Sequence, residues 1–129
     1  MTDLNIVATS RTPQISLKTE TGTLLIEGES YPEDVTGFYD PVFAAVRNHL
    51  ASPDARLDVE IKLIYFNSSS ARSLMELLDL MDSSAAAGAT VSVKWFCDGD
   101  DDITREFAED ISADIEHISI NIFELTRDG

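Results

Sequence analysis

The sequence is poor in cysteine, histidine and basic residues: it has one cysteine, two histidines and nine Lys or Arg in 129 positions. A single cysteine, Cys97, cannot form an intrachain disulfide, which excludes a disulfide-built secreted scaffold. Nine basic residues against 24 acidic ones give a formal charge of −15. Such a surface repels phosphate backbones and anionic lipids, so we expect neither nucleic-acid binding nor membrane binding. A cationic patch on a protein partner is the natural complement.

Long hydrophobic runs are also missing, since no stretch approaches the roughly 20 apolar residues of a membrane span. Residues 1–5 lack the basic and apolar regions of a signal peptide. We therefore expect a soluble cytoplasmic protein. A length of 129 residues with 43% hydrophobic content fits a single domain over residues 1–129. Residues 1–11 carry little pattern and are expected to start the chain as a loose arm.

The templates of classical catalysis are absent as well. The sequence has neither a G-x-S-x-G elbow nor a glycine-rich phosphate loop, so hydrolase and NTPase activities lack support. His49 lies on the apolar side of a predicted helix and His117 starts the last predicted strand, which favours packing and solvated roles over acid–base catalysis. Cys97 falls on the apolar face of a strand, as an inert packed thiol would. No catalytic residue and no cofactor are predicted.

An acidic run near residue 100 partly imitates a calcium loop. The first, third, fifth and twelfth positions of the loop spacing are Asp98, Asp100, Asp102 and Glu109. The sixth position is Ile103 instead of glycine, and a strand instead of a helix precedes the run. Capping of the following helix is therefore the favoured interpretation, and no metal site is predicted. The acidic residues of the preceding helix are interpreted as a solvated face: Glu76, Asp79 and Asp82.

Alternation and helical periodicity predict the order β-β-α-β-α-β-α-β. A hairpin is expected from strands 14–18 and 23–28, followed by strands near 57–65, 90–97 and 117–125. The three long strands alternate polar and apolar residues, which in a parallel sheet indicates helices packed mainly on one face. The predicted fold class is therefore α/β: one domain with a mixed sheet, an N-terminal hairpin and parallel β-α-β units.

Alternation and helical spacing also predict which individual residues face the core. In the central strand, one face is predicted to carry Leu57, Val59, Ile61, Leu63 and Tyr65. Pro41 interrupts the first helical stripe, so that helix either restarts with Asp40 as its cap or is kinked. The stripe of the third helix is predicted to be Ile103, Phe107 and Ile111. Leu80 and Met75 lie off the centre of the second stripe and suit either partner contacts or peripheral core, the latter being favoured for Met75.

The central strand ends in Asn67-Ser68-Ser69-Ser70, which opens the second helix. Asparagine and serine are typical helix caps, because their side chains accept hydrogen bonds from free N–H groups of the first turn. A phosphoryl group at this turn would face the positive helix end, with Arg72 one turn away. Two interpretations stay open on the residues alone, a plain cap and a phosphorylation switch, and plain caps are the commoner.

Several motifs in order resemble the SiaC-like family of bacterial regulatory phosphoproteins. They are Thr12-Pro13, Ser30-Tyr31-Pro32-Glu33, Leu63 to Ser70 with the core Tyr-x-Asn-Ser-Ser-Ser, and Val91 to Trp95. The resemblance covers nearly the whole chain. It implies a STAS-like fold, as in anti-sigma-factor antagonists, and it implies that the hydroxyl residue after the asparagine is phosphorylated. That residue is Ser68 here, where the family pattern has threonine.

The resemblance further implies a non-enzymatic partner-switch protein. In this family a Ser/Thr kinase adds the phosphate and a PP2C-like phosphatase removes it. The unphosphorylated form binds and activates a diguanylate cyclase, which promotes cyclic-di-GMP signalling and biofilm formation. The partner-binding surface is expected to comprise Asn67, Ser69, Ser70, Arg72, Tyr31, Pro32, Glu33 and Asp34.

Two other functions remain as alternatives. The first is a STAS-like module that senses a small molecule or nucleotide without phosphorylation, and the second is a small enzyme using His49 or Glu33. A ligand-induced thermal shift that survives Ser68→Asp would favour the first of these, and turnover in a substrate screen would favour the second.

Overall fold

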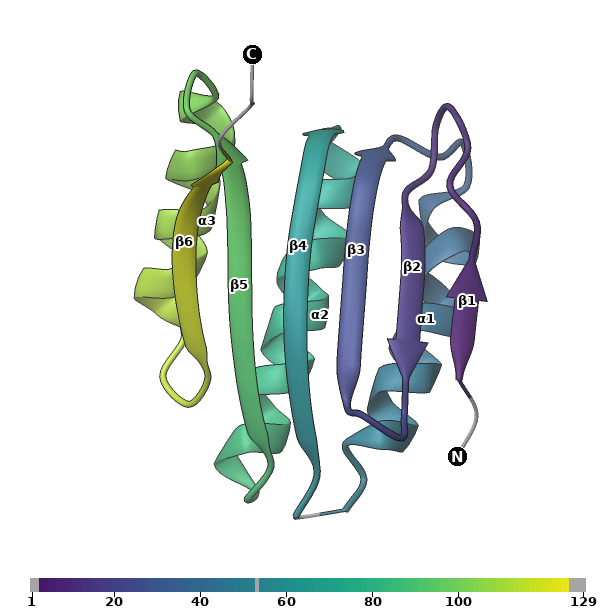
Figure 1. Ribbon diagram of the computed structural model, residues 1–129, viewed down its shortest axis with the longest axis vertical. Helices are drawn as coiled ribbons and strands as arrows, with labels where there is room; N and C mark the ends of the chain where they lie inside the picture. Colours follow the sequence, from purple (N-terminus) through teal and green to yellow (C-terminus); the bar gives the residue numbers. More distant parts are fainter. Residues whose placement is uncertain (1–2, 53, 126–129) are drawn as a thin grey trace.

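The computed structural model describes residues 3–52 and 54–125, which form one sheet and three helices (Figure 1). The strands are β1 (Leu4–Ile6), β2 (Gln14–Lys18), β3 (Thr23–Ser30), β4 (Arg56–Phe66), β5 (Thr90–Asp98) and β6 (Ser119–Leu125). The helices are α1 (Val35–His49), α2 (Ser68–Ala86) and α3 (Asp102–Asp114). No helix within the described residues is long and apolar enough to cross a membrane.

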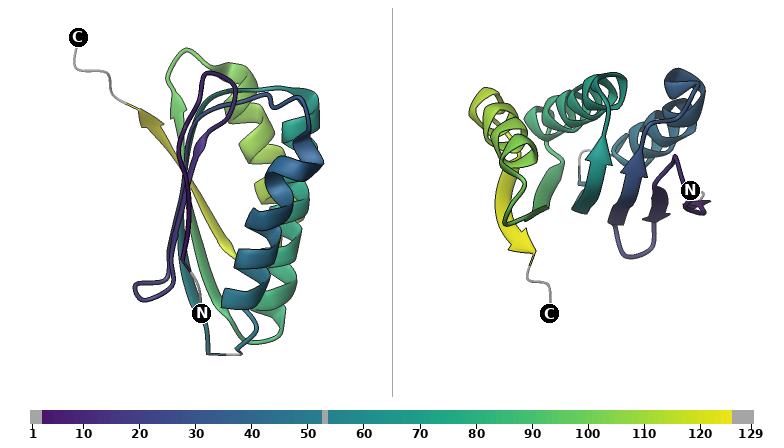
Figure 2. Two further views of the ribbon diagram at one scale, coloured as in Figure 1. Left: turned by 90° about the vertical axis from the view of Figure 1, so that its right-hand side faces the viewer. Right: turned by 90° about the horizontal axis from the view of Figure 1, so that it is seen from above.

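The six strands lie side by side in chain order, β1-β2-β3-β4-β5-β6. The first two pairings are antiparallel and the remaining three are parallel. All three helices pack on the same face of the sheet, as the side view in Figure 2 shows, and the other face is open. The structure therefore confirms the predicted α/β class, with a hairpin, parallel β-α-β units and helices on one face.

The core lies between the sheet and the helix layer. Alternate residues of the strands point into it, and helix residues at three- and four-residue spacing meet them. In β5 the placement of Cys97 on the apolar face is confirmed, since it is buried together with Val91, Val93 and Trp95 at alternate positions. Burial raises the pKa of the Cys97 thiol, which fits the inert packing role expected from the sequence.

The N-terminal segment differs from the expected loose arm. Residues 4–6 form β1, which pairs antiparallel with β2 and places Leu4 opposite Leu17. Leu4 and Ile6 pack against the core, and three residues are too few for their alternation to stand out in the sequence. Residues 1 and 2 of the predicted arm lie outside the described residues.

The first helix runs through its proline without restarting. Asp34 caps α1 by accepting a hydrogen bond from the N–H of Gly37 at 3.1 Å, so the alternative with Asp40 as cap is wrong. Pro41 lies within the helix and is exposed on its outer side. The proline ring would meet the carbonyl of the residue four positions earlier, which here is Gly37, where no side chain adds to the crowding.

The predicted face of β4 holds as far as Leu63 and then changes. Leu57, Val59, Ile61 and Leu63 are buried, but Tyr65 is 52% exposed. The register explains the difference: Gly28 pairs with Leu63 whereas Glu29 pairs with Tyr65, so β4 carries one extra residue at this point. Such a bulge reverses the alternation beyond it. Phe66 therefore packs against the core, and Tyr65 faces outward.

Three other placements need correction. Ile103 is 80% exposed, and the first turn of α3 buries Thr104 instead, whereas the predicted Ile111 is buried and the predicted Phe107 packs against the core. Met75 is 45% exposed rather than peripheral core, while Leu80 packs against the core. The last strand begins at Ser119, so His117 precedes it.

One member of the predicted solvated acidic face has a structural role. Asp82 of α2 accepts backbone hydrogen bonds from His117 at 2.6 Å and from Ile118 at 3.1 Å, and thereby anchors the segment that enters β6. His49 is buried at the end of α1, where its Nε2 lies 2.7 Å from the carbonyl oxygen of Arg56. Within the described residues no group of His, Cys, Asp and Glu side chains is arranged to hold a metal ion.

Candidate functional site

The serine turn lies where β4 ends and α2 begins, at the edge of the sheet formed by the carboxyl ends of the parallel strands (Figure 1). Asn67 is the N-cap of α2, as predicted: its side-chain oxygen accepts a hydrogen bond from the N–H of Ser70 at 2.9 Å. The N–H of Asn67 donates to the carbonyl of Ser30 at 3.1 Å, which ties the turn to the end of β3. The cap thus has one bond inside the helix and one to the sheet.

The three serines have different environments because successive helix positions point about 100° apart. Ser68 and Ser69 are exposed in the first turn of α2, whereas Ser70 is fully buried. Ser70 was predicted to contact a partner directly, and its burial excludes that role. Of the three hydroxyls, only those of Ser68 and Ser69 lie within reach of another protein.

A chain of buried hydroxyls runs inward from Ser70. The Ser30 hydroxyl donates to Ser70 Oγ at 2.8 Å and lies 2.6 Å from the Tyr39 hydroxyl. Because Ser30 uses its proton on Ser70, the Tyr39 hydroxyl donates to Ser30. Burial raises the pKa of Tyr39, and its hydrogen bonds to Ser30 and Ser70 act in the opposite direction. The chain links α1, β3 and α2 in a region closed to solvent.

The β3–α1 connection, residues 31–34, lies beside the serine turn as predicted. The ring of Tyr31 meets the ring of Tyr65 edge to face, with centroids 5.6 Å apart. Pro32 is half-buried, and Glu33 is exposed and forms an ion pair of 2.7 Å with Arg11. Asp34 is occupied as the cap of α1. Of these four predicted residues, Tyr31 is the one that contacts the strand leading into the turn, through the ring of Tyr65.

The loop between β1 and β2 holds Tyr31 from the other side. The hydroxyl of Tyr31 donates to the carbonyl of Ser10, and its backbone N–H donates to the carbonyl of Arg11, both at 2.7 Å. The side chains of Thr9 and Thr12 are hydrogen bonded at 2.6 Å within this loop. The loop, the β3–α1 connection and the serine turn all lie at the same edge of the sheet (Figure 1).

Exposed apolar side chains accompany these polar groups. Ile64 and Tyr65 are 62% and 52% exposed at the end of β4, and Met75 is exposed on α2. Ser68, Arg72 and Met75 follow each other at four- and three-residue spacing, so they share one exposed face of α2. Exposed apolar side chains together with ionic and hydroxyl groups are the usual composition of a protein-binding surface.

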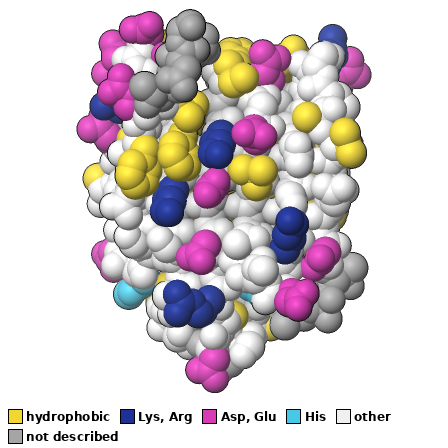
Figure 3. Space-filling view, viewed as in Figure 1, with side chains coloured by type: hydrophobic (Ala, Val, Ile, Leu, Met, Phe, Trp, Pro, Cys, Tyr) yellow, Lys and Arg dark blue, Asp and Glu magenta, His cyan; other side chains and the backbone are white. Residues whose placement is uncertain are grey.

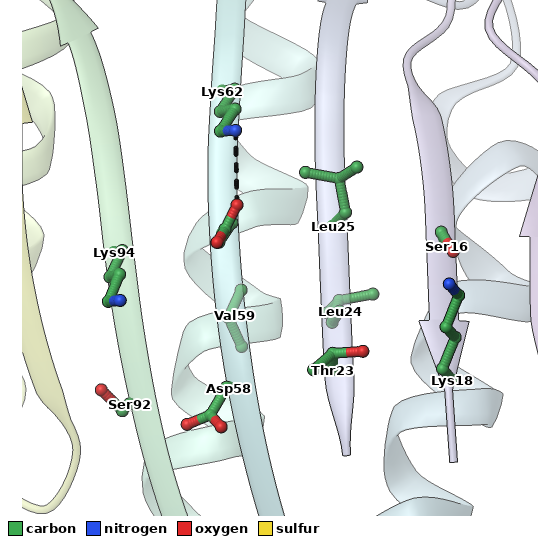
Figure 4. Close-up of a pocket in the computed structure, with 11 residues that line it drawn as sticks. Ser16, Lys18, Thr23, Leu24, Leu25, Asp58, Val59, Lys62, Ser92 and Lys94 are labelled. Atoms are coloured by element: carbon green, nitrogen blue, oxygen red, sulfur yellow. Dashed lines mark ion pairs between the residues drawn. The ribbon is translucent and has the colours of Figure 1, made fainter. Parts of the chain in front are cut away.

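The open face of the sheet carries a second feature, a hollow of about 500 Å³ (Figure 4). All three lysines of the chain line it, Lys18, Lys62 and Lys94, together with Asp58 and Glu60. Figure 3 shows acidic and basic side chains interspersed on this face, with hydrophobic ones gathered over the upper part of β5 and β6. Small-molecule sites are mostly apolar and enclosed. This hollow is open, and charged and hydroxyl side chains line it along with Leu24, Leu25 and Val59, which is typical of a solvated sheet face.

Sequence reasoning missed Ser30, Tyr39 and Tyr65 as parts of the site. Tyr39 and Ser30 lie 29 and 38 positions from Ser68, and only the packing of α1, β3 and α2 brings their hydroxyls together with that of Ser70. Tyr65 was assigned to the core because alternation alone does not reveal a bulge. Gly28, at a positive φ of 122° immediately before the shift in register, is the one local signal of that bulge.

Comparison with known proteins gives consistent matches. The family model described as SiaC family regulatory phosphoprotein matches residues 6–125. An uncharacterized protein of Pseudomonas aeruginosa strain UCBPP-PA14 is 33% identical over 114 residues, which cover 88% of this chain and 90% of that protein. The crystal structure of apo-SiaC from Pseudomonas aeruginosa is 32% identical with a TM-score of 0.88, covering 95% of this chain and 99% of that chain.

A further match is to the crystal structure of the diguanylate cyclase SiaD in complex with its activator SiaC, also from Pseudomonas aeruginosa. The matched chain there is 31% identical with a TM-score of 0.89, and the alignment covers 95% of this chain and 100% of that chain. The matches therefore span nearly the full length of the chain and include both serine-turn elements, β4 and α2.

Proposed function

The chain belongs to the SiaC family of regulatory phosphoproteins, and from this premise we propose that it is a partner-switch protein controlled by phosphorylation of Ser68. The observation that carries the proposal is that Ser68 is exposed at the capped N-terminus of α2, whereas Ser70 in the same helical turn is buried. A kinase adds the phosphate and a phosphatase removes it. The chain itself acts by binding and needs no catalytic residue.

The modification is a phosphoryl transfer. The Ser68 oxygen forms a bond to the γ-phosphorus of ATP held by the kinase, the bond from that phosphorus to the β-phosphate oxygen breaks, and ADP leaves. The serine proton passes to the base of the kinase. In the reverse direction water attacks the phosphorus of phosphoserine, inorganic phosphate leaves, and the Ser68 hydroxyl is restored.

The position of Ser68 suits both states. Unmodified, Ser68 is the exposed first residue of α2, with the exposed Arg72 one helical turn further along the same helix. Phosphorylated, it carries nearly two negative charges at the positive end of a helix, where N–H groups of the first turn stabilise an anion. The fold therefore accommodates the phosphate, and only the character of the surface changes.

The partner we propose is a diguanylate cyclase, which the unphosphorylated protein binds and activates. The support is the crystal structure of SiaD with its activator SiaC, whose matched chain aligns over 95% of this sequence. The proposed binding surface comprises Ser68, Ser69, Arg72 and Met75 of α2, together with Tyr31 and Tyr65 at the same edge of the sheet. A phosphate at the centre of this surface would have to be desolvated on binding. For a dianion without a cationic partner, the free energy of desolvation exceeds the free energy gained from contacts in the interface.

The test uses the cognate kinase, ATP and a SiaD-like diguanylate cyclase from the same organism. Tandem mass spectrometry should place the phosphate on Ser68, and Ser68→Ala should abolish labelling while it retains cyclase binding. Ser68→Asp should lose binding, with Ser119→Asp on β6 as the charge-matched control. Phosphate found only at another residue, or cyclase binding unchanged by Ser68→Asp, would overturn the proposal.

A further inference from the structure

The buried hydroxyl chain closes a ring of contacts around the serine turn. The carbonyl of Ser30 accepts from the N–H of Asn67, the side chain of Asn67 accepts from the N–H of Ser70, and the Ser70 hydroxyl accepts from that of Ser30. These bonds are 3.1, 2.9 and 2.8 Å long. The ring uses both the backbone and the side chain of Ser30, so the first turn of α2 is fixed in position and in rotation.

Tyr39 extends this ring to a second helix. Its hydroxyl lies 2.6 Å from Ser30 Oγ, and the side chains of Tyr39, Ser30 and Ser70 are all 0% exposed. Buried hydroxyls without partners are costly, so three that satisfy each other specify one arrangement of α1, β3 and α2. A plain N-cap needs only the Asn67–Ser70 bond, and the serine and tyrosine hydroxyls are additional.

We infer that the Tyr39–Ser30–Ser70 hydroxyl chain positions the first turn of α2 and thereby selects Ser68 over Ser69 and Ser70 as the modified serine. The inference rests on the proposed phosphorylation of this turn. Ser70 is inaccessible to a kinase because its hydroxyl is buried in the hydroxyl chain. Ser68 and Ser69 are both exposed, but they point about 100° apart on a helix whose rotation is fixed.

The fixed rotation matters because a kinase docks on one side of the turn. The Tyr31–Tyr65 pair and the loop of residues 7–13 lie at this same edge, where the ring contact and the hydrogen bond from Tyr31 to Ser10 hold them together. A turn held by the ring presents one hydroxyl to the docked enzyme. Without these hydrogen bonds the turn frays, since helix ends have few internal hydrogen bonds. The frayed turn then offers either Ser68 or Ser69 to the kinase.

The first experiment is independent of the kinase. Tyr39→Phe removes the tyrosine hydroxyl and keeps the aromatic side chain. Ser30→Ala removes the central hydroxyl, which links Tyr39 to Ser70. Ser73→Ala is the matched control, because Ser73 is a buried serine one turn further along α2 that does not belong to the hydroxyl chain. Amide hydrogen exchange of residues 68–71 should accelerate several-fold in both variants and stay unchanged in the control, with α3 unaffected in all three.

The second experiment measures site choice. After incubation with the cognate kinase and ATP, tandem mass spectrometry should find the phosphate on Ser68 in the wild type. The share on Ser69 should rise several-fold in Tyr39→Phe and in Ser30→Ala, and should not rise in Ser73→Ala. A general loss of stability would also accelerate hydrogen exchange in α3, which the first experiment measures.

The outcomes separate this inference from the function on which it rests. Unchanged exchange at residues 68–71 in both variants would overturn the positioning role, whatever the kinase does. An unchanged Ser68 to Ser69 ratio would overturn the selection of Ser68. Faster exchange with no phosphate on any serine of the turn in the wild type would support the positioning role and overturn the proposed function.

Discussion

The rings of Tyr31 and Tyr65 meet edge to face with centroids 5.6 Å apart, and this contact joins the β3–α1 connection to the strand that leads into the serine turn. Tyr65 is available for the contact because the bulge in β4 turns it out of the core. About half of its surface remains open, three positions before Ser68 in the chain. A large aromatic ring that is fixed by a neighbour and still exposed is a typical energetic centre of a protein interface.

We therefore predict that Tyr65→Ala weakens binding to the diguanylate cyclase by about 2 kcal/mol, or roughly thirtyfold in Kd. The side chain is exposed, so the free energy of unfolding should change by less than about 1 kcal/mol. Isothermal titration calorimetry measures the first quantity and urea denaturation the second. Ile103→Ala on α3 is the control, since Ile103 is more exposed and is not part of the proposed binding surface. Equal effects of both variants on Kd would contradict the assignment.

A second prediction concerns the cap. Asn67→Ala removes the acceptor for the N–H of Ser70, and we expect it to lower the free energy of unfolding by about 1 kcal/mol. Asn67→Asp keeps an acceptor at the same place and should retain most of the stability. Thermal denaturation should show a decrease of roughly 4 °C in Tm for the alanine variant. An aspartate variant as unstable as the alanine one would argue against capping as the cause.

The sequence was sufficient for these features because they are local. Asn67 and Ser70 are three positions apart, so a polar residue before a helical stripe predicts the cap directly. Periodicity likewise predicted β5 and the single helix layer. These properties depend on which residues are apolar and at what spacing, and both can be read along the chain.

What the sequence did not reveal depends on contacts between distant segments. Tyr65 was misplaced because the bulge arises from pairing with β3, which alternation within β4 does not record. The partner of Ser70 is Ser30, forty positions away, so its burial could not be expected from a serine-rich turn. Ile103 was chosen as a core residue on hydrophobicity, whereas the packing of α3 buries the neighbouring Thr104, whose hydroxyl is satisfied by Asp101.

A third prediction tests the anchoring role of Asp82. Its carboxylate accepts backbone hydrogen bonds from Glu116, His117 and Ile118, so Asp82→Ala leaves three N–H groups without their acceptor. We expect a loss of about 2 kcal/mol, or roughly 7 °C in Tm for a chain of this size. Asp79→Ala, an exposed position on the same helix, should change stability by less than about 0.5 kcal/mol. Similar values for the two would show that the contact contributes nothing measurable.

A fourth prediction uses the thiol of Cys97, whose pKa is raised by burial. A raised pKa keeps the thiol protonated, and the thiolate is the reactive form. Native protein at about pH 8 should therefore react with a thiol reagent far more slowly than the same protein in urea, where Cys97 is free. Absorbance of the released chromophore follows both rates. Equal rates in the two states would place Cys97 outside the core.

The fifth prediction concerns the alkaline limit of stability and follows from Tyr39. Burial raises the pKa of its phenol above the ordinary value of 10.0. Below about pH 10 the phenol is protonated in both the folded and unfolded states, so its contribution to stability is constant. Above that pH the unfolded chain loses the proton while the folded chain keeps it, so the free energy of unfolding falls as pH rises through the folded pKa.

Tyr39→Phe removes this titration and leaves every other ionisable group in place. The stability difference between wild type and variant should therefore be constant from about pH 7 to 9 and should shrink toward about pH 11, by at most about 1.4 kcal/mol per pH unit. Urea denaturation of both proteins across this range measures the difference directly. A difference that stays constant to about pH 11 would mean that Tyr39 ionises equally in both states, and hence that its hydroxyl is open to water in the folded protein.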